Sequence, residues 1–175
     1  MKTLLLPFLH DIDVGAIDQG FALARHLDCR LVALSLVHRP EDGVIRLEVI
    51  QQSKDFLEFL YRRSRHFQIP LQRIELHTPS PLSSIRALAS ELNNASILLF
   101  MRNEKGVLLD TDTILAVLQD LRLHFYLVLL HNKHEVITMP QAVLNLLQDS
   151  RQSKVTLTIA TQQPVPQPEL PTTRY

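Results

Sequence analysis

The sequence predicts an α/β protein built on a mostly parallel sheet with helices on both faces. Continuous apolar runs, typical of strands that are covered on both sides, alternate with segments whose apolar residues repeat at helical spacing. The alternation continues from residue 1 to about residue 131 and yields five strands. Because strands that alternate with helices usually lie in parallel sheets, we expect a five-stranded parallel sheet.

Two strands with a helix between them open the chain. Residues 4–9 and 31–37 are the two apolar runs. Asp11 or Asp13 is placed to cap the helix, since a carboxylate accepts hydrogen bonds from the free backbone N–H groups of a first turn. The buried stripe of this helix is formed by Ile17, Phe21, Ala24 and Leu27.

A long helix and a shorter strand come next. The helix is predicted over residues 46–67, and Pro70 ends it because proline disfavours helical geometry in the residue before it. Residues 73–77 form the third strand. Ser80 and Pro81 then mark the start of another helix, with a capping hydroxyl followed by proline in the first turn.

The last elements of the domain are two strands that flank a short helix. Residues 96–101 form the fourth strand, and residues 125–130 form the fifth. The helix between them is predicted over residues 113–121.

The chain continues beyond the domain of residues 1–131. Residues 132–161 are predicted as an extension, with a helix that begins at Thr138-Met139-Pro140 and a half-exposed strand over residues 155–159, where apolar and polar residues alternate. Residues 162–175 hold four of the ten prolines and no core pattern, which predicts an extended tail. The strand either runs parallel to the fifth strand within one subunit or pairs with another subunit.

Composition excludes several classes of function. A formal net charge of +0 and a pI of about 7.1 give no electrostatic reason to expect nucleic acid or an anionic membrane as a partner. The single cysteine, Cys29, excludes an internal disulfide and a cysteine-built zinc site. No apolar run approaches the roughly 18 residues that span a bilayer, and the N-terminus does not have the pattern of a signal peptide. We therefore expect a cytoplasmic protein.

Several of these segments resemble the universal stress protein family. The opening Lys2-Thr3-Leu4-Leu5-Leu6-Pro7-Phe8 resembles the first strand of that family, residues 31–38 resemble its second strand, and residues 95–101 resemble its fourth. The resemblance covers about residues 1–131. It implies the strand order 3-2-1-4-5, a ligand crevice between strands 1 and 4, and a homodimer formed through the strand at residues 125–130. We expect the C-terminal extension to contribute to the same interface.

The glycine motif of the ATP-binding members is missing. Those members end the first strand with an aspartate, where this chain has Leu9, and Arg102 and Lys105 stand at the first two glycine positions. Neither Leu115-Ala116 nor, with a shortened loop, Thr111-Asp112 supplies the last glycine. Glycines let backbone N–H groups approach a phosphate closely, and bulky side chains oppose that approach.

The degenerate crevice that remains would be lined by Leu9, Val37, Arg102 and Lys105. The two cations could attract an anion by charge alone, whereas Asp110 and Asp112 would repel a phosphate. We expect no cofactor, although ATP or AMP stays open as a ligand.

Two other interpretations arise at the ends of the strands. A metal or acid–base site could combine His10, Asp11 and Asp13 with His38 and His77, but a helix cap beside solvated histidines is the favoured interpretation. A phosphoreceiver domain would need an aspartate at the end of the third strand, where this chain has Leu76-His77-Thr78.

Three further groups are assigned structural roles. The cations late in the long helix suit a helix C-terminus better than a nucleic-acid patch; they are Lys54, Arg62, Arg63, Arg65 and His66. Ser80, Ser83 and Ser84 lack the glycine-flanked elbow of a nucleophilic serine. Cys29 is expected to be a small packed thiol.

The favoured function is that of a universal-stress-like regulatory or adaptor protein without tight ATP binding. The first alternative is a divergent nucleotide-binding protein that uses the crevice between strands 1 and 4. The second is an enzyme of the nucleotide-hydrolase type, which is disfavoured because the sequence shows no catalytic set of residues. The partner protein is not identified by the sequence.

Overall fold

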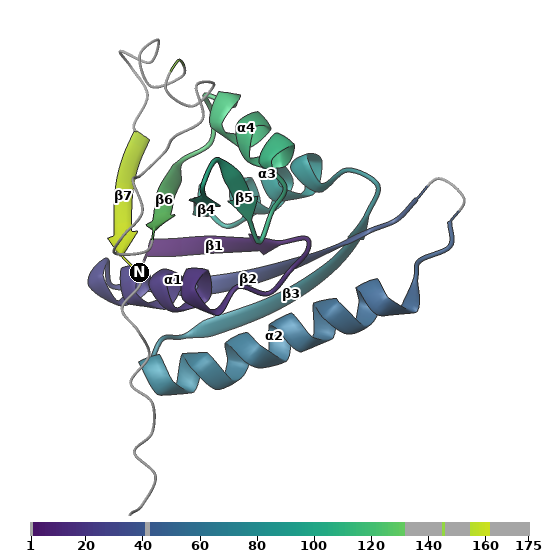
Figure 1. Ribbon diagram of the computed structural model, residues 1–175, viewed down its shortest axis with the longest axis horizontal. Helices are drawn as coiled ribbons and strands as arrows, with labels where there is room; N and C mark the ends of the chain where they lie inside the picture. Colours follow the sequence, from purple (N-terminus) through teal and green to yellow (C-terminus); the bar gives the residue numbers. More distant parts are fainter. Residues whose placement is uncertain (1, 41–42, 132–144, 146–154, 162–175) are drawn as a thin grey trace, which may run out of the picture.

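The structure, a computed structural model, describes residues 2–40, 43–131, 145 and 155–161. All of its strands lie in one sheet (Figure 1). They are β1 (Lys2–Phe8), β2 (Cys29–His38), β3 (Leu71–Thr78), β4 (Ser96–Arg102), β5 (Lys105–Val107), β6 (Phe125–His131) and β7 (Val155–Thr161). The helices are α1 (Val14–His26), α2 (Leu47–Phe67), α3 (Pro81–Glu91) and α4 (Thr111–Gln119).

The strand order confirms the predicted fold class. The sheet runs β3-β2-β1-β4-β6-β7, and every neighbouring pair along this path is parallel. With β6 as the predicted fifth strand, the first five positions reproduce the predicted order. The order reverses at β1, because β2 and β3 lie on one side of it and β4 and β6 on the other. Ligands of such sheets bind outside the carboxyl ends of the strands at this point of reversal.

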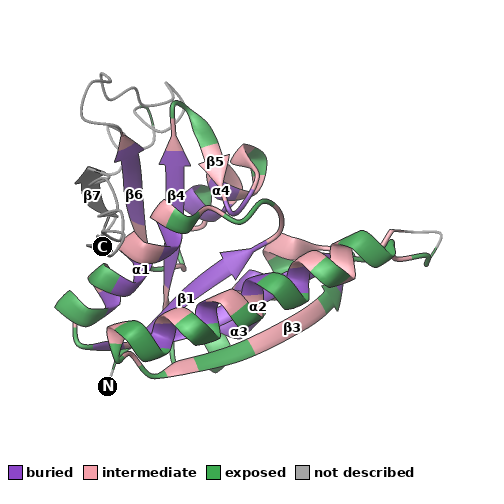
Figure 2. Ribbon diagram, turned by 60° about the horizontal axis from the view of Figure 1, so that its bottom comes forward, coloured by how far each residue is buried: buried purple, intermediate pink, exposed green. Residues whose placement is uncertain are grey.

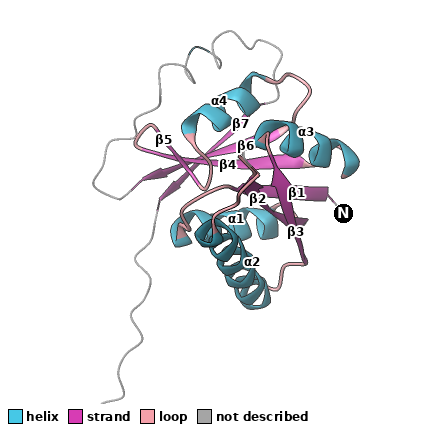
Figure 3. Cartoon of the chain, turned by 90° about the vertical axis from the view of Figure 1, so that its right-hand side faces the viewer, coloured by secondary structure: helices cyan, strands magenta, loops and turns pink. Residues whose placement is uncertain are grey.

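The helices cover both faces of the sheet. Figure 3 shows α1 and α2 on one face and α3 and α4 on the other. Side chains alternate along each strand, so each strand contributes to two apolar layers. Under α1 and α2, Phe8 stacks on Phe56 with ring centroids 4.0 Å apart. Under α3 and α4, Ile85 and Ile114 pack with Leu99. Both layers are needed to bury the continuous apolar runs seen in the sequence.

Burial is uneven across the sheet. Figure 2 shows that β1, β4 and β6 are largely buried, whereas β3 at the sheet edge consists mostly of intermediate and exposed residues. Charged side chains on β3 explain its short apolar pattern in the sequence. Arg73 lies over the ring of Tyr61 and within 3.7 Å of Glu58, and Glu75 accepts a hydrogen bond from Ser53 at 2.5 Å.

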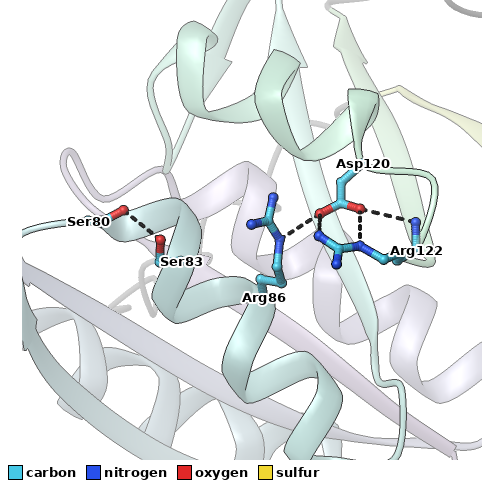
Figure 4. Close-up of polar contacts among 5 residues, drawn as sticks. All are labelled: Ser80, Ser83, Arg86, Asp120 and Arg122. Carbon is cyan, nitrogen blue, oxygen red and sulfur yellow. Dashed lines mark hydrogen bonds and ion pairs between the residues drawn. The ribbon is translucent and has the colours of Figure 1, made fainter.

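Local chemistry sets the helix ends. Asp13 caps α1 by accepting a hydrogen bond from the Ala16 N–H at 2.8 Å, as predicted. At the end of α2, Gln68 adopts a left-handed conformation, so the last helical residue is Phe67, three residues before Pro70. Ser80 occupies the N-cap position of α3, but its hydroxyl makes no capping bond. It donates to Ser83 Oγ at 2.9 Å instead, which corrects the predicted role (Figure 4).

Two strands are present in addition to the five predicted for the domain. The short strand β5 was not predicted; it runs antiparallel to β4 and forms a hairpin with it. The predicted strand at residues 155–159 is β7, which lies parallel to β6 in the same chain from Phe125↔Val155 to His131↔Thr161. Of the two arrangements left open by the sequence, pairing within one subunit is therefore the one observed.

Parts of the C-terminal prediction lie outside the described residues. The helix expected from Thr138-Met139-Pro140 is not described apart from Asn145, which is helical, and the tail at residues 162–175 is not described. Among the described helices, none combines the length and apolar character needed to cross a membrane.

Candidate functional site

The candidate site lies where β1 and β4 separate at their carboxyl ends. β1 pairs with β2 over all of its residues, from Lys2 to Phe8. It pairs with β4 only at Leu4↔Ser96 and Leu5↔Ile97. Beyond Leu5 the two strands are no longer hydrogen-bonded to each other, and this opening coincides with the reversal of strand order. We refer to it as the β1–β4 split.

A tight hairpin follows β4 at the mouth of the split. Arg102 pairs with Lys105, so the turn has only two residues, Asn103 and Glu104. Both have positive φ, 48° and 66°. Two-residue turns of this kind match the twist of the strands that they join, and asparagine is among the residues that tolerate the left-handed region best. The hairpin therefore follows directly on the carboxyl end of β4.

Two leucines anchor the hairpin on both faces of the sheet. Leu108 is 1% exposed and packs in the layer under α1 and α2 with Phe8 and Phe100. Leu109 is equally buried in the opposite layer with Leu99. The backbone closes the same space, because the carbonyl of Leu108 accepts hydrogen bonds from the N–H groups of the two residues after β1, Leu9 at 2.8 Å and His10 at 3.3 Å. The split is therefore filled by apolar side chains and backbone hydrogen bonds.

The chain turns sharply from the hairpin into α4. A Cβ at Gly106 would lie 2.2 Å from the carbonyl oxygen of Leu109, so only glycine fits. Asp110 caps α4 by accepting hydrogen bonds from the N–H and the hydroxyl of Thr113, at 2.7 and 2.8 Å. The positive end of a helix can bind an anion. Here that position already holds a carboxylate of the chain.

The guanidinium of Arg102 is engaged in an ion pair with Asp13. Its two terminal nitrogens donate to the carboxylate of Asp13, at 2.5 and 3.2 Å, and both side chains are about three-quarters buried. Burial alone would raise the pKa of Asp13, but the hydrogen bonds from Arg102 and from the Ala16 N–H outweigh it, so this pKa lies below its ordinary value. The pair joins the start of α1 to the end of β4.

Of the four residues predicted to line the crevice, the structure brings Arg102 and Lys105 together as partners across the β4–β5 hairpin. The backbone N–H of Leu9 donates a hydrogen bond to the carbonyl of Leu108 in the segment that follows the hairpin. Val37 is fully buried within β2, and Lys105 is exposed on β5. Arg102 is held by Asp13. Sequence reasoning missed Asp13 as the partner of Arg102 and missed Leu108, whose only signal was its place in a short apolar run after a loop.

The structure also describes the surroundings of other candidate residues from the sequence. The part of the chain that the structure describes contains no group of three or more histidine, cysteine or acidic residues that could hold a metal. In the basic stretch of α2, Arg62 pairs with Glu58 and Arg63 with Asp18, as expected of a structural role. Cys29 is buried, its thiol donates to the Leu27 carbonyl at 3.4 Å, and burial raises the pKa of that thiol.

Comparison with known proteins finds a likeness in fold. No protein-family model matches the chain, and no curated protein does. Solved structures of universal stress proteins do match. One from Burkholderia pseudomallei is 12% identical, covers 89% of this chain and 94% of its own, and has a TM-score of 0.44. One from Archaeoglobus fulgidus, in complex with dAMP, is 8% identical over 91% of this chain and 97% of its own, with a TM-score of 0.47.

A third match is a universal stress protein family protein from Arabidopsis thaliana with AMP bound. It is 8% identical over 93% of both chains, with a TM-score of 0.41. At such identities the likeness concerns the fold alone. The chain is therefore similar to universal stress proteins in fold, and the likeness says nothing of its site.

Proposed function

We propose that this protein is a universal-stress-like regulatory or adaptor protein that does not bind ATP tightly. The observation that carries the proposal is the hairpin that follows β4, which fills the β1–β4 split with Leu108 and Leu109. A nucleotide in this position would have to displace two buried leucine side chains. Burial of each is worth about 1.5–3 kcal/mol, which a nucleotide would have to offset before it gained affinity.

The charges of the split support the same conclusion. A phosphate would meet a helix N-terminus already capped by Asp110, and it would have to compete with Asp13 for Arg102. Replacing an intramolecular carboxylate by a phosphate at the same arginine exchanges one charged hydrogen bond for another and gains little. Of the two cations predicted for the crevice, Lys105 then remains to attract the ligand, as an exposed and solvated point charge.

Two alternatives carry over from the sequence. The proteins from Archaeoglobus fulgidus and Arabidopsis thaliana were solved with dAMP and AMP bound. Such binding here would require the hairpin to open. An enzyme of the nucleotide-hydrolase type would need a nucleophile or general base in the split, where the apolar Leu9 and Leu108 lie.

Calorimetric titration with ATP tests the proposal. We expect no saturable heat at submillimolar ATP in the full chain. Submillimolar affinity that is lost in an Arg102→Ala variant would contradict the proposal and favour the nucleotide-binding alternative. An Arg62→Ala variant is the matched control, because Arg62 also forms an ion pair with a carboxylate but lies on the exposed surface of α2.

A homodimer belongs to the same proposal. The sequence predicts that the C-terminal extension contributes to the interface, and β7 now forms the outer neighbour of β6. A second subunit would therefore approach the sheet through β7 and not through β6 directly. An exposed edge strand is a ready site for such pairing.

A further inference from the structure

The amino-terminal end of the sheet, opposite the hairpin, carries a groove that the proposed function does not use. One part of it has a volume of about 650 Å³ and lies at the first residues of β1, β4 and β6. A second part of about 460 Å³ lies between α3 and the loop before β6. The two parts share Asn94, Ala95 and His124, so they form one continuous depression, which we call the amino-end groove.

Cations line both parts of the amino-end groove. Lys2 and Arg30 line the first part, and Arg86 and Arg122 line the second. No carboxylate is among the described residues that line either part. The chain as a whole has a formal net charge of +0, so this groove is a local excess of positive charge and not the reflection of a basic protein.

A buried carboxylate holds the two arginines of the second part in place. Asp120, only 7% exposed, accepts a hydrogen bond from Arg86 Nε at 2.6 Å and from Arg122 Nε at 3.2 Å. The two arginines reach it from different elements, and the terminal nitrogens of Arg86 point away from the carboxylate (Figure 4). Asp120 carries one negative charge and the two arginines carry two positive charges, so this cluster has a net charge of +1. The hydrogen bonds to Asp120 hold both guanidinium groups in place.

In the first part of the groove, a hydrogen bond holds Arg30 in place. Arg30 Nε donates to the hydroxyl of Thr3 at 2.8 Å, a neutral partner that orients the guanidinium without cancelling its charge.

The end of α3, which adjoins the groove, carries a partial negative charge. Its last carbonyls are occupied by the backbone, since those of Leu88 and Ala89 accept from the N–H groups of Leu92 and Ala95. They therefore oppose an anion only weakly.

We propose that the amino-end groove binds an acidic, extended peptide segment of a partner protein. The two cationic pairs line different parts of one open groove, which suits a ligand with several separated carboxylates better than a single phosphate. Leu121, which directly precedes Arg122 in the chain, is an apolar side chain that is 85% exposed. Guanidinium groups bind carboxylates through paired hydrogen bonds. This inference rests on the proposed adaptor function and gives its partner a chemistry.

Fluorescence anisotropy with a labelled oligoglutamate peptide tests this inference on the full chain. We expect saturable binding at low ionic strength, weakened by salt, and no binding of oligoglutamine of the same length. Removing the charges in an Arg86→Gln, Arg122→Gln double variant should lower the affinity about tenfold or more. Because that variant leaves Asp120 buried without its partners, a Lys2→Gln, Arg30→Gln double variant provides a second test that strands no buried charge. Arg62→Gln on α2 is the matched control and should bind like the wild type.

Several results would overturn the inference. These are no binding, equal binding by both groove variants and the wild type, equal weakening by Arg62→Gln, binding of inorganic phosphate without oligoglutamate, or tighter binding of an oligouridylate. The proposed function fails separately, since ATP binding at the hairpin would depend on Arg102 and survive in both groove variants. Each failure can thus be recognised without the other.

Discussion

Arg102 and Asp13 form a two-point ion pair that ties the end of β4 to the first turn of α1. Both terminal nitrogens of the arginine donate to the carboxylate, which also caps α1 by accepting from the Ala16 N–H. The Asp13 carboxylate thus caps α1 and also neutralises Arg102, a partly buried cation at the β1–β4 split. Its consequence for stability depends on pH.

The first prediction concerns acid. The pKa of Asp13 is lowered from its ordinary value of 3.8, so the folded state holds its proton more weakly than the unfolded state does. The resulting stability is present above pH 3.8 and is lost as the pH falls through the lower folded pKa. An Asp13→Asn variant keeps the cap but loses this dependence. Its urea midpoint should therefore change less than that of the wild type below pH 4.

Other carboxyl groups also have shifted pKa values, but they contribute equally to the wild type and to the Asp13→Asn variant. The pKa values of Glu75 and Asp120 are also lowered, and that of Asp18 is raised, but all three are present in both proteins. If wild type and Asp13→Asn lose stability in parallel down to low pH, the ion pair does not contribute as described.

Truncating the leucine that fills the split should be costly. A Leu108→Ala variant removes a side chain that is 1% exposed, and such deletions cost about 2–5 kcal/mol in transfer and cavity terms. Urea unfolding measures the loss. Leu121→Ala is the matched control, because that leucine is 85% exposed and should change the free energy of unfolding by no more than about 0.5 kcal/mol. Equal effects of the two substitutions would show that Leu108 is not a core residue.

Gly106 and Gly20 should respond differently to alanine. At Gly106 the new Cβ would lie 2.2 Å from the carbonyl oxygen of Leu109. This oxygen belongs to the backbone, so it can move aside only if the hairpin shifts. We expect a loss of about 1–3 kcal/mol in the free energy of unfolding. At Gly20 the nearest atom, 3.2 Å away, is the end of the Leu98 side chain, and the helical position favours alanine. A thermal scan that finds Gly106→Ala as tolerated as Gly20→Ala would contradict the tight turn.

The predicted homodimer can be tested by removing β7. A chain truncated after Ser150 lacks the strand that pairs with β6. We expect it to dimerise less tightly than the full chain, measured by light scattering at several concentrations, with circular dichroism to check that it is folded. A truncated chain that dimerises as tightly as the full one would place the interface elsewhere.

The sequence predicted the elements whose signals are local. Apolar runs gave the parallel strands, Asp13 was identified as a possible cap, and Ser80-Pro81 marked the start of α3. The hairpin was missed because β5 has only three residues, Lys105–Val107, which is too short for any alternation to be visible. Its turn also lacks the common asparagine–glycine pair, since Glu104 occupies the second position.

The site was predicted only in part because its decisive contacts are long-range. The glycine count indicated that a phosphate loop was missing, but it could not indicate that Leu108 would fill the space. Arg102 and Asp13 are 89 residues apart in the chain, and nothing in the local pattern pairs them. The amino-end groove likewise joins residues from the start of the chain to the loop before β6. Only the sheet order brings such positions together.

The most direct test of the closed split is an NMR titration of the full chain with ATP. The amides of Leu9 and His10, which donate to Leu108, and of Gly106, which donates to Thr111, report on the hairpin. We predict that their signals stay unchanged up to about 1 mM ATP, the concentration at which a binding free energy of about 4 kcal/mol would half-saturate the site. Saturable shifts of these three amides at lower ATP concentrations would contradict the account, because they would show that the hairpin yields to a nucleotide.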